Sequence, residues 1–170
     1  MLRPACGERG SSVVSFLLAL PILLAFLFAV VDLGRSVFLG MALEDAAHAA
    51  CRAVCSAGSG EAEQTAREAA LAASPSLAAE GLRLAVAAHV GELEEEPYVH
   101  RLYDADEGAF EERPSRTARR TVRVDLELEG SYLTPAGALI AVAEGRGDGG
   151  FAYAASAAGE RDETVEGGAW

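Results

Sequence analysis

The chain has 170 residues, with 26 acidic side chains against 14 basic ones and a formal net charge of -12. This excess of negative charge excludes binding to nucleic acid through neutralised phosphates. Although 51% of the residues are hydrophobic, only 6% are aromatic. The water-exposed part of the chain is therefore expected to build only a small core and to depend on contacts with neighbouring proteins for its stability.

An uninterrupted apolar stretch from Val13 to Val31 follows the basic residues Arg3 and Arg9. At about 1.5 Å per residue this stretch reaches roughly 28 Å as a helix, which is close to the hydrocarbon thickness of a bilayer. The apolar core of a secretory signal is usually about 7 to 15 residues long and ends at a small-x-small cleavage site, whereas this one runs directly into Asp32. We therefore expect a retained transmembrane helix over residues 11–34.

The charges on either side of this helix predict its orientation. Arg3 and Arg9 precede it, while a long acidic segment follows it. Since positive residues favour the cytoplasmic side, residues 1–10 are predicted to be a cytoplasmic leader and the carboxy-terminal segment to be exported. Asp32 and Arg35 are three residues apart and are expected to pair at the outer surface of the membrane.

Good helix formers without proline continue beyond the span, so a helical extension over residues 35–57 is predicted. One face of this extension carries Glu44, His48, Cys51 and Cys55. A single straight helix cannot complete the four-ligand tetrahedron of a zinc site, so no metal or other cofactor is expected, and a redox- or metal-binding helix is a distant alternative. Parallel helices packed face to face would join Cys51 or Cys55 between subunits; the alternative is that both are small buried residues.

After a glycine-containing break, residues 58–158 are predicted to form a small exported α+β domain. A second helix is expected from Glu61 to Ala73. Alternating apolar residues predict a strand from Leu82 to Val90 and, after an acidic turn at residues 92–96, a hairpin partner from Tyr98 to Tyr103.

The clearest strand signal is the strict alternation of apolar and charged residues from Val122 to Leu128, which is typical of a sheet with one buried face. The apolar segment from Ala136 to Ala143 is too short to span a bilayer and predicts a short packed helix or a hydrophobic patch against a partner. Residues 151–157 predict a final strand. The acidic, glycine-containing residues 159–170 are expected to be a disordered tail.

A dense basic patch lies between residues 113 and 123. Its members are Arg113, Arg116, Arg119, Arg120 and Arg123. In an acidic protein such a patch is typical of a solvated loop, and the alternative is a docking site for an acidic segment such as residues 92–96 of another subunit. The sequence carries no hydrolase elbow, phosphate-binding loop or supported carboxylate pair, so no catalytic residue is assigned and the chain is not expected to be an enzyme.

Several short segments follow one another along the chain in a characteristic order. They are residues 9–16 (RGSSVVSF), 19–21 (ALP) and 32–35 (DLGR), then Ala42, Leu43, Ala46 and Ala47, and finally Leu133, Thr134 and Pro135. In this order they resemble the TadE-like family, the pseudopilin components of tight-adherence (Flp-type) pilus machinery. The resemblance is strong up to residue 55, weaker up to residue 143, and uninformative in the tail.

The resemblance implies processing by a membrane prepilin peptidase just after Gly10, which makes Ser11 the new amino terminus. Gly10 has no side chain to hinder a protease, and a helix that begins just afterwards would leave the cut site unwound. Most of the family carries Glu at the fifth residue after the cut, where this chain has Ser15. A carboxylate in lipid is costly and is kept mainly for a task, so pairing with a neighbour's terminal amine is expected to be relaxed or missing here.

The sequence thus predicts a pilin-like α+β protein with a long amino-terminal transmembrane helix that continues into a small exported antiparallel-sheet domain. The resemblance implies a structural component of pilus assembly in the cell membrane. Its expected partners are the membrane, a prepilin peptidase and other pilus or tight-adherence secretion components, in a homo- or hetero-oligomer. The alternative function is an uncleaved single-pass anchor of an exported protein unrelated to pili.

Overall fold

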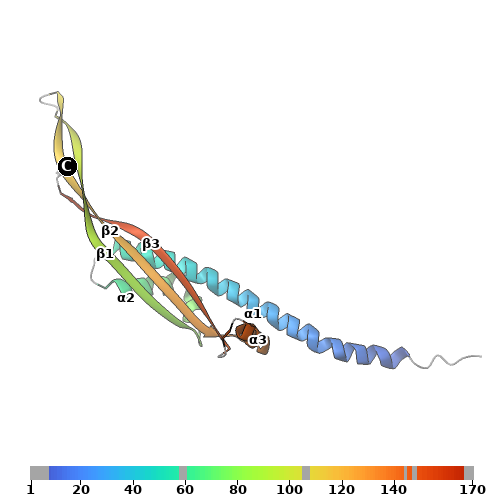
Figure 1. Ribbon diagram of the computed structural model, residues 1–170. Helices are drawn as coiled ribbons and strands as arrows, with labels where there is room; N and C mark the ends of the chain where they lie inside the picture. The colour runs from blue at the N-terminus through green and yellow to red at the C-terminus, as the bar shows by residue number, and fades with distance from the viewer. Residues whose placement is uncertain (1–7, 58–60, 105–107, 144, 147–148, 167–170) are drawn as a thin grey trace, which may run out of the picture.

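The computed structural model describes residues 8–57, 61–104, 108–143, 145–146 and 149–166. Within them a long amino-terminal helix leads into a small domain with an antiparallel sheet (Figure 1). The elements are α1 (Glu8–Ser56), α2 (Ala62–Ala73), the 3-10 helix η1 (Pro75–Ala78), β1 (Arg83–Asp104), β2 (Ala109–Ser131), α3 (Pro135–Ala143) and β3 (Gly150–Glu166). This architecture confirms the predicted fold class, and α2 and α3 coincide closely with the two short helices expected after residue 57.

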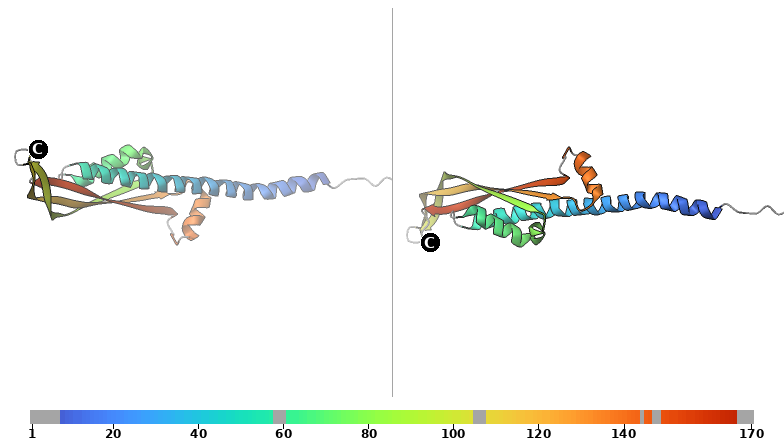
Figure 2. Two further views of the ribbon diagram at one scale, coloured as in Figure 1. Left: turned by 90° about the horizontal axis from the view of Figure 1, so that it is seen from above. Right: turned by 90° about the horizontal axis from the view of Figure 1, so that it is seen from below.

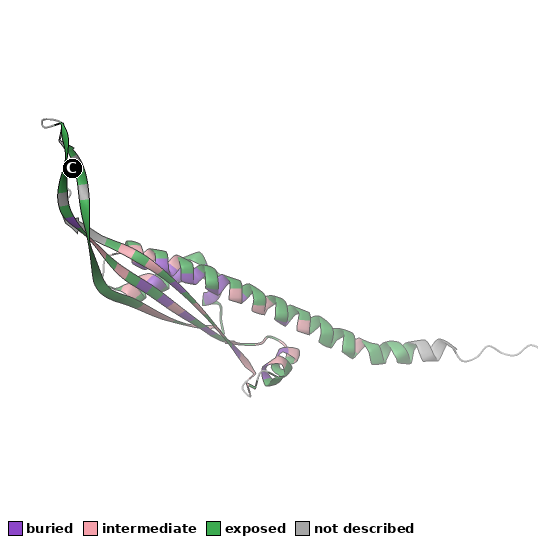
Figure 3. Ribbon diagram, turned by 45° about the horizontal axis from the view of Figure 1, so that its top comes forward, coloured by how far each residue is buried: buried purple, intermediate pink, exposed green. Residues whose placement is uncertain are grey.

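α1 is one continuous helix of 49 residues, and Pro21 lies inside it without interrupting it. Its two halves differ in what surrounds them. Side chains up to Val31 are mostly exposed, whereas from Leu39 onward one face is buried against the sheet domain (Figure 3). That buried face is rich in alanine, which lets the helix backbone approach its neighbours closely. Its fully or almost fully buried residues are Leu39, Ala42, Leu43, Ala46, Ala47, Ala50, Cys51 and Val54.

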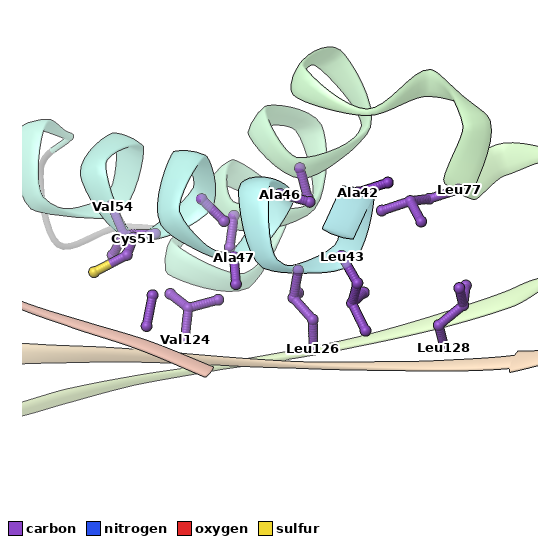
Figure 4. Packing of buried hydrophobic residues seen from close by; sticks show 14 of the residues in the cluster. Ala42, Leu43, Ala46, Ala47, Cys51, Val54, Leu77, Val124, Leu126 and Leu128 are labelled. Carbon is purple, nitrogen blue, oxygen red and sulfur yellow. The ribbon is translucent and has the colours of Figure 1, made fainter. Parts of the chain in front are cut away.

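The sheet has the order β1-β2-β3, with both neighbours antiparallel to the central strand. Val122, Val124, Leu126 and Leu128 of β2 are all fully buried, so the predicted alternation of this strand is confirmed. α1 and α2 lie on the same side of the sheet, which makes a two-layer domain (Figure 2). Figure 4 shows Leu43 of α1 facing Leu126 across the layer boundary.

The predicted hairpin between Leu82–Val90 and Tyr98–Tyr103 is wrong. Both segments belong to β1, which runs through the acidic residues 92–96 with only a register shift between Val90 and Leu93, and its partner is β2. The acidic run suggested a turn because carboxylates are rare in strand interiors. Here arginines on the neighbouring strand compensate for it, since Glu94 lies opposite Arg119 and Glu95 forms an ion pair of 3.2 Å with Arg116.

The tail prediction also needs correction. β3 extends through Glu166 instead of ending at residue 157, and its last part pairs with β2 up to the Arg116–Glu166 register. Glu160 and Asp162 of this part lie beside one of the same arginines, with Arg119 Nε 3.3 Å from an Asp162 oxygen. Cross-strand pairing thus orders a segment whose composition alone favours disorder. The final residues, 167–170, lie outside the described residues.

Candidate assembly helix and its junction with the sheet domain

The apolar half of α1 exposes its side chains along its length. Leu18, Ile22 and Phe26 are 70%, 73% and 69% exposed. Among the described residues this is the one helix long and apolar enough to cross a membrane. Exposed apolar surface on this scale, on a helix long enough to cross the hydrocarbon layer, indicates that the helix anchors the chain in a membrane.

The expected processing site lies at the start of this helix. Because α1 begins at Glu8, the peptide bond between Gly10 and Ser11 lies in the first helical turn, and the expectation of an unwound cut site is corrected. No proline lies between Pro4 and Pro21, so no residue of this kind interrupts a helix that begins before Gly10. The first turn of a helix has amide groups without an intrahelical acceptor, which makes it the easiest turn to open.

Ser15 is exposed on the apolar half of α1, one turn further along. A serine in a helix can return its hydroxyl to the preceding turn at little cost, so this position can lie in lipid without a charged partner. Ser15 therefore presents a small polar surface on the apolar half of α1.

Asp32 marks the junction between the two halves of α1. Its side chain is only 1% exposed, although it directly follows the exposed apolar stretch. The carboxylate accepts a hydrogen bond of 3.2 Å from the backbone N–H of Leu133 and another from the hydroxyl of Thr134. These bonds offset the cost of burying the carboxylate and attach the loop after β2 to the end of the span.

Thr134 also starts α3. It precedes Pro135, which is the first residue of that helix, and its hydroxyl oxygen accepts a hydrogen bond of 3.4 Å from the N–H of Gly137. This is the arrangement of an N-cap residue followed by proline at the first helical position. Asp32, Thr134 and Gly137 thus form a chain of contacts from the membrane helix to α3.

Gly137 is buried in this junction, and the space around it is too small for any larger residue. A Cβ atom placed there would lie 2.6 Å from the Asp32 carboxylate and would also collide with the side chain of Tyr132. The backbone of α3 can therefore approach the Asp32 carboxylate this closely only because residue 137 is a glycine.

Arg35 makes a second attachment one helical turn beyond Asp32. Its guanidinium donates a hydrogen bond of 2.9 Å to the backbone oxygen of Ser131, and it lies 5.7 Å from the centre of the Phe151 ring. Asp32 and Arg35 were expected to pair with each other. Asp32 instead contacts the loop after β2, and Arg35 contacts the last residue of β2, because this part of the chain lies against α1 and offers backbone groups in need of partners.

The two cysteines of α1 face β3. Cys51 is buried and Cys55 is half-buried, and both are free thiols. A Cβ atom at Gly159 would lie 3.3 Å and 3.2 Å from the two sulfur atoms, so the strand backbone passes directly over them. Burial raises the pKa of the Cys51 thiol, and the neighbouring Cys55 adds to this effect.

This position agrees with buried packing of Cys51 and disfavours a link between subunits through it, since the sheet of the same chain covers its sulfur. A hollow of about 400 Å³ beside the pair is lined by His48, Arg52 and Glu160 among others. Within the described residues, no group of three or more His, Cys, Asp or Glu side chains is arranged to hold a metal ion. Glu44, on the predicted stripe, is exposed.

The basic patch lies in β2 and is therefore not a loop. Its described side chains pair within the chain, as Arg116 does with Glu95 and Arg119 with Glu160 and Asp162. The acidic partner proposed for another subunit is thus supplied by this chain itself. The alternation that revealed the buried face of β2 stops at Val122, so it carried no signal for the strand's longer, charged part.

The fold and this junction define a membrane-anchored protein with a single amino-terminal apolar helix and a sheet domain packed on its continuation. Residues 10–52 match the family model of TadE-like proteins. The match covers the apolar half of α1, Asp32, Arg35 and most of the buried face, and it confirms the resemblance for this segment. The searches of curated proteins and of solved structures give no match.

Proposed function

We propose that the chain is a pseudopilin-like component of a tight-adherence pilus assembly system and acts by assembly instead of catalysis. The observation that supports this most is the extent of the family match: residues 10–52 include both the exposed half of α1 and the half that carries the sheet. One helix therefore combines a membrane segment with a rigid support for the domain.

The proposed mechanism is lateral packing of α1 against helices of other pilus or secretion components. In lipid, helices associate through close van der Waals contact and small or weakly polar residues, and the exposed half of α1 offers Ser15 and Ala19 on its surface. Because Ser15 replaces the usual carboxylate, this packing does not depend on a buried ion pair with a neighbour's amine.

We further propose that a prepilin peptidase removes residues 1–10, with the leader in the cytoplasm and the sheet domain outside. The support is the family match, which begins at Gly10, together with the position of Gly10 in the weakly held first turn of α1.

The test is to express the chain with and without a prepilin peptidase and to measure the mass of the mature protein. We expect Ser11 as the first residue only when the peptidase is present. Gly10→Val should block this cleavage because its branched side chain obstructs the peptidase at the bond, whereas Gly7→Val serves as the matched control and should leave it unchanged. A chain that keeps residues 1–10 in the presence of the peptidase would favour the alternative, an uncleaved membrane anchor unrelated to pili.

A further inference from the structure

α3 has one buried and one exposed apolar face. Gly137 and Ala141 face the domain and are buried. Leu139 and Val142, on the other side, are 72% and 64% exposed, and Leu133 just before the helix is 67% exposed. The helix contains no charged residue, so its outer face has nothing that favours contact with water.

The position of α3 indicates what covers that face. Leu133 and Thr134 bind the carboxylate of Asp32, the first residue after the apolar stretch of α1. α3 therefore begins at the level where the membrane span ends. Figure 2 shows that α3 is directed across the axis of α1 and away from it.

A helix that crosses the span at its end lies along the surface of the bilayer. With 9 residues, α3 is about 14 Å long, which is too short to enter the membrane as a second span but suits an interfacial position. Interfacial helices bury their apolar face about 5–10 Å deep at the boundary of headgroups and acyl chains.

We propose that α3 is such an interfacial helix, with Leu133, Leu139 and Val142 inserted into the outer boundary of the bilayer that α1 spans. Its apolar face continues the lipid-exposed surface of α1, and the bonds to Asp32 hold the two at a constant relative height. The helix thereby sets how far the sheet domain stands from the membrane. This inference depends on the membrane anchoring of α1 but not on pilus assembly.

Tryptophan fluorescence in lipid vesicles tests the proposal. The single tryptophan, Trp170, is first changed to Phe, and one new tryptophan is introduced as Leu139→Trp in the full-length chain. Vesicles contain phosphatidylcholine brominated either near the headgroup end or deep in the acyl chain. We expect a blue-shifted emission that loses about half its intensity to the shallow bromines and less to the deep ones, because the interfacial depth is small.

Two matched variants calibrate the depth. Ile22→Trp, in the middle of the span, should be quenched more by the deep bromines than by the shallow ones. Val99→Trp, 60% exposed on β1 toward the hairpin end farthest from the span (Figure 1), should be quenched by neither. Val142→Trp is a second probe of α3 and should behave as Leu139→Trp does.

The proposal is overturned if both α3 probes are quenched no more than Val99→Trp. A blue-shifted emission without lipid quenching would show that another protein or a second copy covers α3, and would also overturn it. If Ile22→Trp itself is unquenched, the anchoring premise fails. The processing test reads the mass of the amino terminus, so failure of α3 to enter lipid is distinguishable from failure of the proposed function.

Discussion

Asp32 shows how one residue can have two roles that a sequence cannot separate. A carboxylate at the end of an apolar stretch marks the limit of the lipid. In the structure the same carboxylate is buried and accepts hydrogen bonds from Leu133 and Thr134, so it also attaches the sheet domain to the span.

Replacing this carboxylate should destabilise the junction. Asp32→Ala leaves the N–H of Leu133 and the hydroxyl of Thr134 without their acceptor, and we expect a loss of about 1–3 kcal/mol in the free energy of unfolding. Urea unfolding in detergent micelles, followed by circular dichroism, measures it. Asp45→Ala, an exposed position on the same helix, is the control and should change the value by no more than about 0.5 kcal/mol. Equal effects of the two changes would contradict the assigned role of Asp32.

The buried thiol of Cys51 should make the stability of the protein depend on pH. Burial raises the pKa of Cys51. As pH rises from the ordinary thiol pKa toward this raised value, the unfolded chain releases the proton first, so the free energy of unfolding should fall across that window and be unaffected below it. Cys51→Ala should remove the decline.

Alkylation by iodoacetamide tests the burial of Cys51 independently of the free energy of unfolding. Cys51 should react more slowly than the half-buried Cys55 at neutral pH, because only the thiolate reacts and the sheet covers its sulfur. Peptide mapping by mass spectrometry distinguishes the sites. Faster labelling of Cys51 would refute the buried position of its sulfur.

At the scale of elements, the packing of α3 against α1 depends on the glycine at position 137. Gly137→Ala places a methyl group against the Asp32 carboxylate and Tyr132, and we expect it to cost about 1–3 kcal/mol in the free energy of unfolding through overpacking. Gly40→Ala is the matched control, since nothing lies within 4 Å of its Cβ position and alanine favours a helix by up to about 1 kcal/mol. The same urea unfolding measures both, and a neutral Gly137→Ala would show that the approach is looser than the structure indicates.

The sheet should depend on its buried face more than on its ion pairs. Leu126→Ala removes a fully buried side chain between β2 and α1 and should cost about 2–5 kcal/mol. Glu95→Ala removes the exposed ion pair with Arg116 and should cost no more than about 1 kcal/mol. Unfolding of the two variants under identical conditions compares them. A larger effect of Glu95→Ala would mean that charge pairing, instead of the core, holds β1 to β2.

At the scale of the whole molecule, the span and the sheet domain lie at opposite ends of one long helix (Figure 1). If the leader is cytoplasmic, the domain is outside, and trypsin added to intact spheroplasts should cleave the exposed β1–β2 ribbon at sites such as Arg101 and Arg116. An epitope attached before residue 1 should be protected until the spheroplasts are lysed. Protection of the ribbon together with loss of the epitope would show the opposite orientation, with the leader outside and the sheet domain in the cytoplasm.

Local patterns predicted much of this fold. The length of the apolar stretch, the proline-free continuation after Arg35 and the alternation from Val122 to Leu128 each depend on near neighbours in the chain, so the span, its extension and the buried face of β2 were readable from the residues alone. The same holds for the amino-terminal signature, which the family match to residues 10–52 bears out.

The extent of the strands and the junction could not be read in this way. The acidic residues 92–96 and 159–166 become strands because arginines of β2 lie opposite them. Asp32 is buried because a loop a hundred residues later packs against it. The sequence by itself determined the elements whose stabilising contacts are local, and only the tertiary structure decided those whose hydrogen-bonding and charge partners are distant in the chain, because such contacts exist only once the fold has brought them together.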